Sequence, residues 1–400
     1  MSPDEIDWLQ TVEGTAAAQT ASELLANGND QLRAIEALRR SLSPEQARAA
    51  LGVTLGRAVA SSKFEDAERL FCDREAAEQT SHELVARHTA KRLSGAARVA
   101  DLGCGMGGDL MELARNSEVV AVDRDPTRLA MAAANSAVRG LGDRSEFTAQ
   151  DIGEFSSEGF DAGWFDPSRR DEHSRTLDPA RWSPSLTDTL TYARLIPGAG
   201  IKLAPGIDRD LLPEDAELEF ISLDGRLVAA ILWLGTLAAG RYRATILTTR
   251  GTEAALSDEA DAPPSVAPPG QYLYDPNPAV GRAQLIHRLA QDLEAWQLDA
   301  RIAYLSSDSV ASTVFARRFR IHASMPFSER GLLEALRGLD AGRVEVMKRG
   351  SAIETNELAR RLDRQLDGER VLTVALTRIG TAQTAIVCER ERDLESGDER

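Results

Sequence analysis

The stretch VADLGCGMGGD, residues 99–109, constrains this chain more than any other, because it carries four glycines within six positions after a small apolar run. An amphipathic segment, Leu110 to Arg115, follows at once, so the expected order is strand, turn and helix. Glycines at such a turn permit positive φ angles and let a ligand approach the main chain, while the next helix presents its N–H groups. The stretch therefore predicts a site for a nucleotide-type cofactor.

Two cofactor classes compete for this turn. Gly103, Gly105 and Gly108 match GxGxxG, and Asp123 after the next apolar run could hold a ribose, as in a dinucleotide-binding fold. Asp101, two positions before the first glycine, separates the two classes. A carboxylate there would repel a pyrophosphate, whereas the amino acid end of S-adenosylmethionine brings an ammonium and a cationic sulfonium. The pattern DxGxGxG therefore favours S-adenosylmethionine as the cofactor.

The composition is that of a globular protein with more than one domain. Four hundred residues with 42% hydrophobic content suffice for two or three cores. No run of 18 apolar residues occurs and the N-terminus is acidic, so we expect a cytoplasmic protein with no membrane segment. The three cysteines and five histidines are scattered, which fits neither a disulfide framework nor metal-ligand spacing, and we expect no metal.

The charge argues mildly against a nucleic-acid partner but is unevenly distributed. A net charge of −16 repels a phosphate backbone at long range. Residues 317–349, however, hold eight basic side chains against four acidic ones. This segment is either a contact face for RNA or an ordinary solvated surface with salt bridges, and both interpretations remain open.

Residues 1–95 are predicted to form a helical region. Leucines and alanines recur there at helical spacing, and Ser43-Pro44-Glu45-Gln46 has the form of a capped helix start. The last helix of the region is expected over residues 73–93, beside the cofactor. Its Arg74, Glu78 and Gln79 either touch the amino acid moiety of the cofactor or lie on the surface of a packing helix.

Residues 96–250 alternate strands and helices and predict an α/β domain of the Rossmann-like class. Strands are expected at 98–101, 119–123, 145–149, 162–165, 200–203, 217–223, 228–234 and 243–248, with a helix at 126–139. This order implies a parallel sheet with helices on both faces and a ligand at the carboxyl ends of the strands. The last strands, joined by Asp224-Gly225, are expected to form an antiparallel hairpin.

The remaining chain is predicted to contain a linker, a second folded unit and a tail. Residues 251–270 are rich in proline and acidic side chains and predict a linker. Residues 271–391 predict an α+β unit with helices at 279–294, 329–339 and 355–367 and strands at 301–305, 343–348, 371–378 and 384–389. Residues 392–400 form a charged tail.

Three carboxylates fall where predicted strands end, in the order Asp101, Asp123 and Asp151. Asp101 is expected to receive the cationic end of S-adenosylmethionine, Asp123 both ribose hydroxyls and Asp151 the adenine amino group. The turn around the cofactor is expected to be shaped by Gly103, Gly105 and Gly107. This arrangement resembles motif I and the following strand ends of the class I S-adenosylmethionine-dependent methyltransferases.

The sequence Asp166-Pro167-Ser168-Arg169-Arg170 follows the fourth predicted strand and is expected at the site of methyl transfer. In class I enzymes that methylate exocyclic amines of bases, a carboxylate or amide, two prolines and an aromatic residue stand here. Asp166 and Pro167 keep that pattern, whereas Ser168 and Arg169 replace the second proline and the aromatic ring. Arg169 can stack on a base or bind a phosphate. Alternatively, both arginines pair with the acidic residues that follow and fix the loop.

The span from 74 to 170 is similar to a group of bacterial class I methyltransferases distantly related to the RNA cap guanine-N2 enzymes of the trimethylguanosine-synthase type. The likeness rests on DLGCGMGGD, VDRDP, ANS and FDPSRR at residues 101–109, 122–126, 134–136 and 165–170. The second unit, with YLYDPNPAV, RIAYL and EVMKRG at residues 272–280, 301–305 and 345–350, resembles the THUMP-like domain attached to that group. THUMP domains bind RNA, so the resemblance implies an RNA substrate, with Lys348 and Arg349 as phosphate contacts.

The leading hypothesis is a methyltransferase acting on tRNA or rRNA, with an exocyclic amine such as guanine N2 as the acceptor. Asp166, Pro167 and Arg169 would form the catalytic site, and Arg170 would contact the substrate. A small-molecule or protein methyltransferase is the second hypothesis, favoured by the acidic charge and the missing aromatic residue. A non-catalytic binding protein on the same scaffold is the third, and an oxidoreductase is the weakest. The oligomeric state is left open.

Overall fold

The structure, a computed structural model, describes residues 1–168, 178–257 and 263–391. The chain divides into two compact units. Unit 1 comprises Met1–Leu218 with Ala229–Ala239, and unit 2 comprises Glu219–Val228 with Gly240–Arg400. No helix of the described residues is long and apolar enough to span a bilayer.

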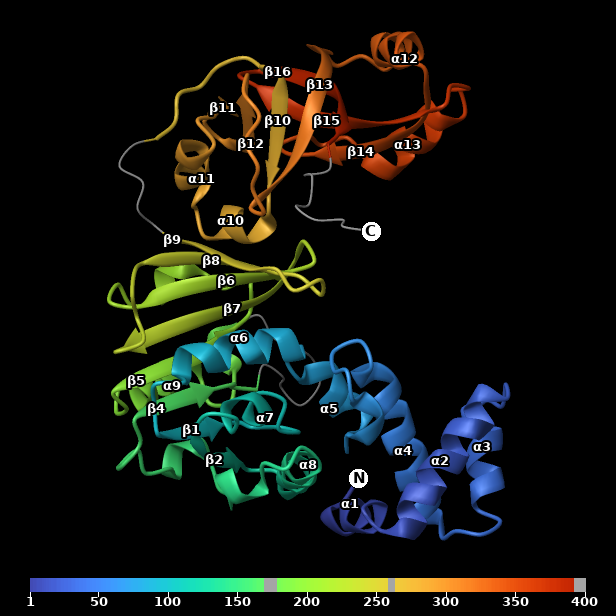
Figure 1. The fold of residues 1–400 in the computed structure, drawn as a ribbon, viewed down its shortest axis with the longest axis vertical. Helices are drawn as coiled ribbons and strands as arrows, with labels where there is room; N and C mark the ends of the chain where they lie inside the picture. The colour runs from blue at the N-terminus through green and yellow to red at the C-terminus, as the bar shows by residue number, and fades with distance from the viewer. Residues whose placement is uncertain (169–177, 258–262, 392–400) are drawn as a thin grey trace, which may run out of the picture. The chain divides into compact units, whose positions relative to one another are not determined.

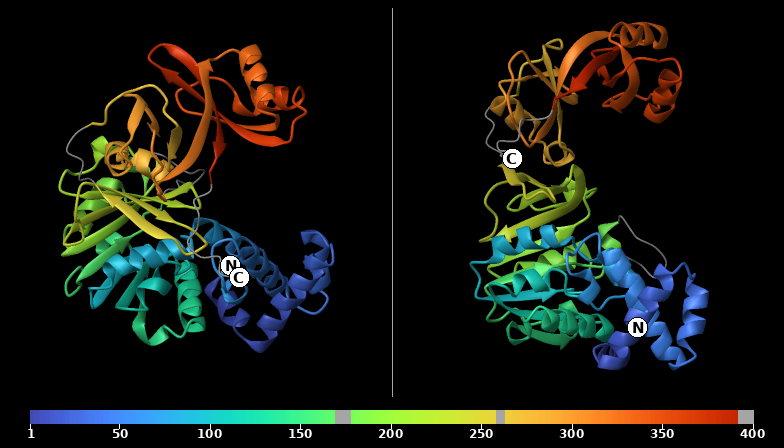
Figure 2. Two further views of the ribbon diagram at one scale, coloured as in Figure 1. Left: turned by 45° about the horizontal axis from the view of Figure 1, so that its top comes forward. Right: turned by 45° about the vertical axis from the view of Figure 1, so that its right-hand side comes forward.

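The N-terminal region of unit 1 is helical, as predicted. Its helices are α1 (Pro3–Leu9), α2 (Val12–Ala26), α3 (Gln31–Leu38), α4 (Pro44–Ala60), α5 (Arg74–Gln79) and α6 (Glu83–Leu93). The predicted cap of α4 is confirmed, since the side chains of Ser43 and Gln46 each accept the backbone N–H of the other. Figure 1 shows α1 to α5 gathered beside α7 and α8, and both views of Figure 2 keep them together.

The single helix predicted over 73–93 is wrong, because the chain leaves the helix at Thr80 and re-enters it after His82. Thr80 is extended, and the Nδ1 of His82 accepts the N–H of Leu84 to cap α6. The Lys63 ammonium donates to the carbonyls of Ala77, Glu78 and Thr80, at 2.9, 2.9 and 2.8 Å. These bonds satisfy carbonyl groups that a continuous helix would have paired internally.

The sheet of unit 1 confirms the predicted Rossmann-like architecture. Its strands are β1 (Arg98–Leu102), β2 (Glu118–Asp123), β3 (Ser145–Ala149), β4 (Ala162–Phe165), β5 (Gly198–Leu203) and β7 (Arg226–Gly235), in the order β3-β2-β1-β4-β5-β7. The first five are parallel and β7 is antiparallel to β5. The helices between them are α7 (Leu110–Leu113), α8 (Pro126–Val138) and α9 (Leu186–Ala193). The carboxyl ends of β1, β2, β4 and β5 therefore meet at one edge.

A shared core fastens the helical region to this sheet. Buried side chains from α1, α4 and α5 pack with Met106, Met111 and Met131, which come from the glycine turn, α7 and α8. Within the same region the fully buried Asn135 of α8 accepts the N–H of Phe71 at 2.7 Å. Its amide donates to the carbonyls of Phe71 and Met106 at 3.0 and 2.9 Å. One amide thus links the helical region, α8 and the glycine turn.

Unit 2 is built on a seven-stranded sheet in the order β11-β12-β10-β13-β16-β15-β14. The strands are β10 (Tyr272–Pro276), β11 (Trp296–Asp299), β12 (Ile302–Ser307), β13 (Ala316–Pro326), β14 (Ala341–Lys348), β15 (Arg370–Ile379) and β16 (Ala382–Arg390). The helices are α10 (Pro278–Arg282), α11 (Ile286–Asp292), α12 (Glu329–Gly338) and α13 (Thr355–Asp363). Leucines of α12 and α13 form one core with β14, β15 and β16. Strands β6 (Glu217–Leu223), β8 (Tyr242–Leu247) and β9 (Glu253–Ser257) lie next to one another.

Several expectations for the second half of the chain need correction. Strand β9 lies inside the range predicted as a linker and pairs with β8, so regular structure extends past residue 250. The helix predicted over 279–294 is broken at Gln284, whose φ of 60° no helix interior accommodates. Strands β10, β11 and β13 were not anticipated. Three arginines near the start of β13, of which Arg318 is buried and Arg317 and Arg320 are exposed, conceal its strand pattern.

The Asn135 linkage can be tested directly. We expect Asn135→Ala to lower the free energy of unfolding by about 2–3 kcal/mol, because it leaves buried backbone groups of Phe71 and Met106 without partners. Urea unfolding followed by far-UV circular dichroism measures this loss. The exposed Asn116, changed to alanine, is the matched control. An unfolding midpoint in Asn135→Ala equal to that of the control variant would contradict the assignment.

Candidate active site

The glycine turn brings the end of β1 against the end of β4. Gly103, Gly105 and Gly107 have φ angles of 91°, 55° and 86°, a region that favours glycine. A Cβ on Gly103 would lie 2.6 Å from the carbonyl oxygen of Asp166, so no larger residue fits there. The N–H of Asp166 donates to the carbonyl of Leu102 at 3.0 Å. The glycine turn therefore lies directly against the backbone of Asp166.

The fourth glycine of the turn, Gly108, leaves room for a side chain from the helical region. A Cβ on Gly108 would lie 2.0 Å from the hydroxyl oxygen of Thr80, in the loop between α5 and α6. The next residue in that loop, Ser81, donates its hydroxyl to the Asp109 carboxylate at 2.9 Å. The helix that follows, α7, has only one turn. The helical region thus supplies two hydroxyl side chains to the turn, which the sequence pattern did not reveal.

Asp101 is a buried carboxylate without a hydrogen-bond partner. It is 1% exposed, and among the described residues neither of its oxygens is hydrogen-bonded. Burial raises the pKa of Asp101 well above its ordinary value, and the nearby charges of Asp109, Asp166 and Asp123 raise that pKa further. An orphaned carboxylate of this kind is suited to a cationic group. It would repel a pyrophosphate, which disfavours the dinucleotide alternative.

A lysine stands among these carboxylates. Lys202 lies near the end of β5, is 7% exposed, and its ammonium is 2.6 Å from Oδ2 of Asp166 and 3.8 Å from Oδ2 of Asp109. Burial raises the pKa of Asp109, and the ammonium of Lys202 opposes that rise. Sequence reasoning missed Lys202. The available signal was a single charged residue inside the apolar stretch Gly198–Leu203.

The two other predicted cofactor carboxylates lie at adjacent strand ends. Asp123, at the end of β2, accepts the N–H groups of Gly105 and Asp125 at 3.0 Å each, and burial raises its pKa. Asp151 follows β3, is exposed, and accepts the N–H of Gly153 at 2.9 Å. Their contacts with ribose and adenine stay predictions.

The predicted substrate side of the site is only partly described. Asp166 is partly exposed and Pro167 is buried, both directly after β4. Arg169 and Arg170 lie outside the described residues. On α5, Arg74 pairs with Glu78 at 2.8 Å and Gln79 donates to Glu75 at 3.0 Å. This pairing favours the interpretation of α5 as a packing helix with a polar surface.

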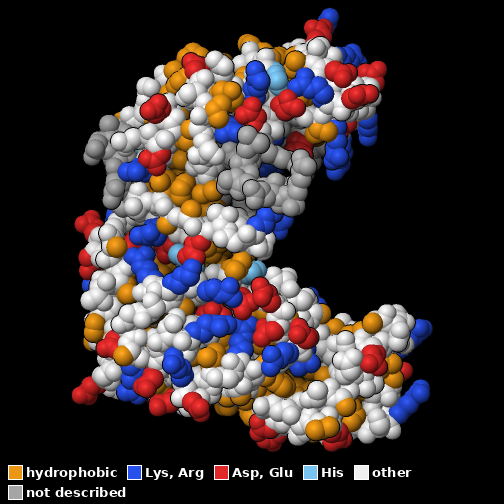
Figure 3. Space-filling model, viewed as in Figure 1, with side chains coloured by type: hydrophobic (Ala, Val, Ile, Leu, Met, Phe, Trp, Pro, Cys, Tyr) orange, Lys and Arg blue, Asp and Glu red, His pale blue; other side chains and the backbone are white. Residues whose placement is uncertain are grey.

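The predicted RNA contacts of unit 2 both have protein partners. Lys348 donates to the carbonyl of Ile353 at 2.9 Å. Arg349 donates to Asp275 at 2.8 Å and to the carbonyl of Pro276 at 2.6 Å, and stacks over Tyr304. On the face drawn in Figure 3, basic and acidic side chains of unit 2 are interspersed. The basic segment 317–349 thus contains salt bridges, and its contact with RNA stays a prediction.

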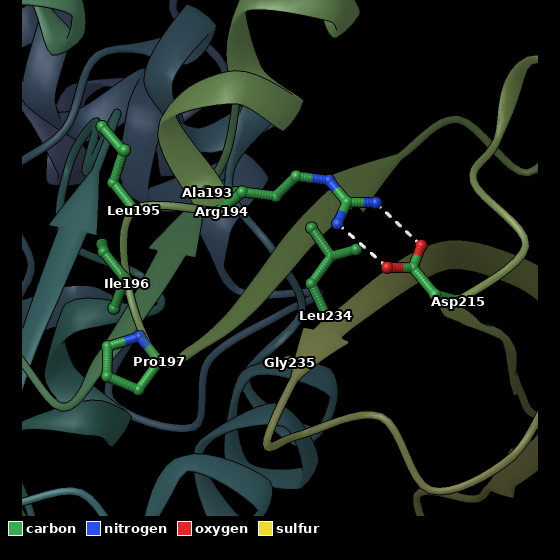
Figure 4. Close-up of a pocket in the computed structure, with 8 residues that line it drawn as sticks. All are labelled: Ala193, Arg194, Leu195, Ile196, Pro197, Asp215, Leu234 and Gly235. Carbon is green, nitrogen blue, oxygen red and sulfur yellow. Dashed lines mark hydrogen bonds and ion pairs between the residues drawn. The ribbon is translucent and has the colours of Figure 1, made fainter.

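A surface pocket of unit 1 lies at the opposite edge of the sheet. It is lined by residues 193–197 before β5 and by Leu234 and Gly235 at the end of β7. Figure 4 shows its charged pair, in which Arg194 binds Asp215 through two hydrogen bonds of 2.9 and 2.7 Å. Because β5 and β7 are antiparallel, this pocket faces the amino end of β5, away from Asp166.

The fold and the orphaned carboxylate define a class I methyltransferase, and comparisons with known proteins agree. Residues 93–168 match a methyltransferase domain family, 316–390 a THUMP domain-like family, and 2–58 a domain of unknown function. A putative methyltransferase from Porphyromonas gingivalis W83 shares the fold, with a TM-score of 0.76 and 17% identity over 94% of this chain and 99% of that one.

Similarity to two curated proteins of Mycobacterium tuberculosis, from strains CDC 1551 and H37Rv, establishes the family of this chain. Each is described as an uncharacterized S-adenosylmethionine-dependent methyltransferase and is 37% identical over 81% of this chain and 89% of its own length. The chain belongs to the S-adenosylmethionine-dependent methyltransferases with a C-terminal THUMP-like domain. It is an enzyme, and S-adenosylmethionine is its cofactor. Within the described ranges, no group of three or more His, Cys, Asp or Glu side chains could hold a metal ion.

The residues present fit this cofactor. The Asp101 carboxylate would offer two unsatisfied buried oxygens to the cofactor's ammonium, and the space beside Gly105 is open, since no atom of the described residues beyond its chain neighbours lies within 4 Å of its Cβ position. The bound cofactor supplies an electrophilic methyl group on a sulfonium. Asp101 and the glycine turn would hold the cofactor there, and Asp166 stands beside them after β4.

The substitution Asp101→Asn is expected to weaken cofactor binding and to stabilise the cofactor-free fold. We expect it to weaken S-adenosylmethionine binding at least roughly 100-fold, because a neutral amide replaces the carboxylate that pairs with the ammonium. We also expect the cofactor-free variant to melt at a higher temperature than the wild type, because an unpaired buried carboxylate is removed. Calorimetric titration and thermal melting measure the two effects.

The pH dependence follows from the direction of the pKa shift of Asp101. A carboxyl whose pKa is raised in the folded state costs stability as the pH rises above its unfolded pKa of about 3.9. The melting temperature of the wild type relative to Asp101→Asn should therefore fall between acidic and neutral pH, while its cofactor affinity should rise. A difference in melting temperature that is independent of pH would contradict the burial of an ionisable Asp101.

Proposed function

We propose that this enzyme methylates RNA, tRNA or rRNA, at an exocyclic amine of a base such as guanine N2. The observation that carries the proposal is the Asp166 carboxylate, which stands after β4 beside the glycine turn and is held at one oxygen by Lys202. The match of residues 316–390 to the THUMP domain-like family supports RNA as the substrate class. A cytoplasmic location accords with such a substrate.

The chemistry assigned to Asp166 follows from the weakness of the nucleophile. The lone pair of an exocyclic amine is conjugated with the base, so the amine reacts only when it is oriented toward the methyl group. A carboxylate oxygen that accepts one amine hydrogen turns the lone pair out of conjugation. The same oxygen stabilises the positive charge that develops on the nitrogen. Pro167 stiffens the backbone after Asp166. Arg169 and Arg170 are proposed to contact the base or its phosphate.

A small-molecule or protein substrate is the second candidate. The net charge of −16 and the replacement of the aromatic residue by Arg169 favour it. Retention of the protein on immobilised tRNA that weakens with salt supports RNA, whereas absence of retention at low salt supports the second candidate. A comparison of nucleosides from a deletion strain and its parent then identifies the modified base.

Asp166→Asn tests the assigned acceptor. We expect the variant to transfer methyl groups to RNA about 100-fold more slowly, because an amide accepts hydrogen bonds more weakly and takes no proton. Its affinity for S-adenosylmethionine should stay within a few-fold of the wild type. Radiolabelled methyl transfer to bulk RNA and calorimetry measure the two quantities. The exposed Asp143, changed to asparagine, is the control, and equal transfer rates in both variants would exclude Asp166 from the reaction.

Lys348→Gln tests the proposed contribution of unit 2. A lysine that neutralises one phosphate contributes about one to the slope of log affinity against log salt concentration. We expect the variant to lower that slope by about one without changing cofactor affinity. The exposed Lys91 of α6, changed to glutamine, serves as the control. An unchanged slope in Lys348→Gln would remove this residue from the RNA contact surface.

A further inference from the structure

The position of Lys202 is not explained by the packing of β5. All six residues of this strand are buried, and the other five are glycines or apolar residues. A buried ion pair is weak evidence for stability, because taking both charges out of water costs as much as their attraction returns. An apolar residue of the same length would serve the core of the sheet equally well. The charge of Lys202 therefore requires another reason.

The surroundings of Lys202 supply that reason. Its ammonium is 2.6 Å from Asp166 and 3.8 Å from Asp109. Its charge also opposes the rise in the pKa of Asp101 that burial and the neighbouring carboxylates cause. Asp109 also accepts the Ser81 hydroxyl. The remaining nearby cation, Lys63, is directed at three backbone carbonyls. Asp101 is consequently the carboxylate of the cluster that has neither an ion pair nor a hydrogen bond among the described residues.

We propose that Lys202 is a positioning residue for methyl transfer, which fixes Asp166 by one oxygen and reserves Asp101 for the cationic end of the cofactor. The ammonium holds Oδ2 of Asp166, so Oδ1 can accept the hydrogen of the acceptor amine. Pairing of Asp109 and Asp166 with Lys202 also limits the excess negative charge beside the sulfonium. The first part rests on the proposed function, and the second depends only on the cofactor.

The reaction is balanced without another reactant. The acceptor nitrogen forms its bond to the methyl carbon while the carbon–sulfur bond breaks, and that bonding pair stays on sulfur. The nitrogen then loses its extra proton to solvent by way of Oδ1 of Asp166. Lys202 takes no part in this proton transfer and acts through its position and charge.

The first test measures cofactor and product binding and needs no acceptor. S-adenosylmethionine and S-adenosylhomocysteine differ by the positive charge on sulfur. Removing the ammonium in Lys202→Met makes the site more negative. The dissociation constant of S-adenosylhomocysteine divided by that of S-adenosylmethionine should therefore rise roughly tenfold. In Lys202→Arg, which keeps the charge, the ratio should stay within about twofold of the wild type. An unchanged ratio in a folded Lys202→Met overturns the charge part of the proposal.

The second test uses a double-mutant cycle with Asp166→Asn. If Lys202 acts through Asp166, Lys202→Met should lower kcat about 100-fold in the wild-type background but less than about threefold in the Asp166→Asn background. The KM for RNA should stay constant, and Lys202→Arg should restore part of kcat. A purely structural lysine would instead give additive losses. Additive losses, or full activity in Lys202→Met, overturn the positioning part.

A charge-balanced variant guards against misfolding. Lys202→Met leaves the buried Asp109 and the partly exposed Asp166 without their cation, so the double variant Lys202→Met/Asp109→Asn removes one charge of each sign. We expect it to fold and to bind the cofactor with a ratio near that of the wild type, yet to keep the low kcat, because Asp166 is no longer held. Full kcat in this variant overturns the proposal.

The outcomes also distinguish failure of the RNA function from failure of the positioning function of Lys202. If the wild type transfers no methyl group to tRNA or rRNA, the RNA function fails. The binding ratio still decides the charge part, and the double-mutant cycle is then run on whichever small-molecule or peptide acceptor the wild type methylates. If RNA is methylated and the cycle is additive, the RNA function stands and the positioning part fails.

Discussion

The active site depends on the cost of placing several carboxylates together, two of them buried. Parallel strands bring Asp101 and Asp166 to the same sheet edge, and the turn after β1 adds Asp109. Like charges gathered in a site of low dielectric oppose folding unless cations compensate them. Lys202 pairs with two of the three, and we propose that the cation of the cofactor compensates the third. On that proposal, the unpaired carboxylate of the cofactor-free fold gives the site its selectivity for a cationic ligand.

The sequence predicted the fold of unit 1 well because its signals are local. Strand β4 was predicted over its observed range, and the ends of β2 and β3 were predicted to the residue, since apolar runs bounded by charged or turn residues mark them. Prediction failed where a distant group decides the local structure. The end of α5 depends on Lys63, which stands well before it in the chain and satisfies its last carbonyls.

The candidate site was predictable only for residues within motifs. Asp101 was identified from its spacing to Gly103, and the structure adds that it is buried and unpaired. Lys202 and Ser81 escaped because their function arises from contacts across the fold, with Asp166 and Asp109 respectively. In unit 2, the basic segment was noticed, but the partners of Arg349 depend on the pairing of distant strands and could not be read from composition.

The contact of Thr80 and Ser81 with the glycine turn has a consequence for how such enzymes can diversify. These two residues precede the segment 93–168 that matches the methyltransferase family, yet they touch Gly108 and Asp109 within it. The helical region and the sheet therefore cannot be exchanged as independent modules. A recombination that joins a foreign helical region to this sheet must also bring a loop of matching shape, so the two segments are expected to be inherited as one block.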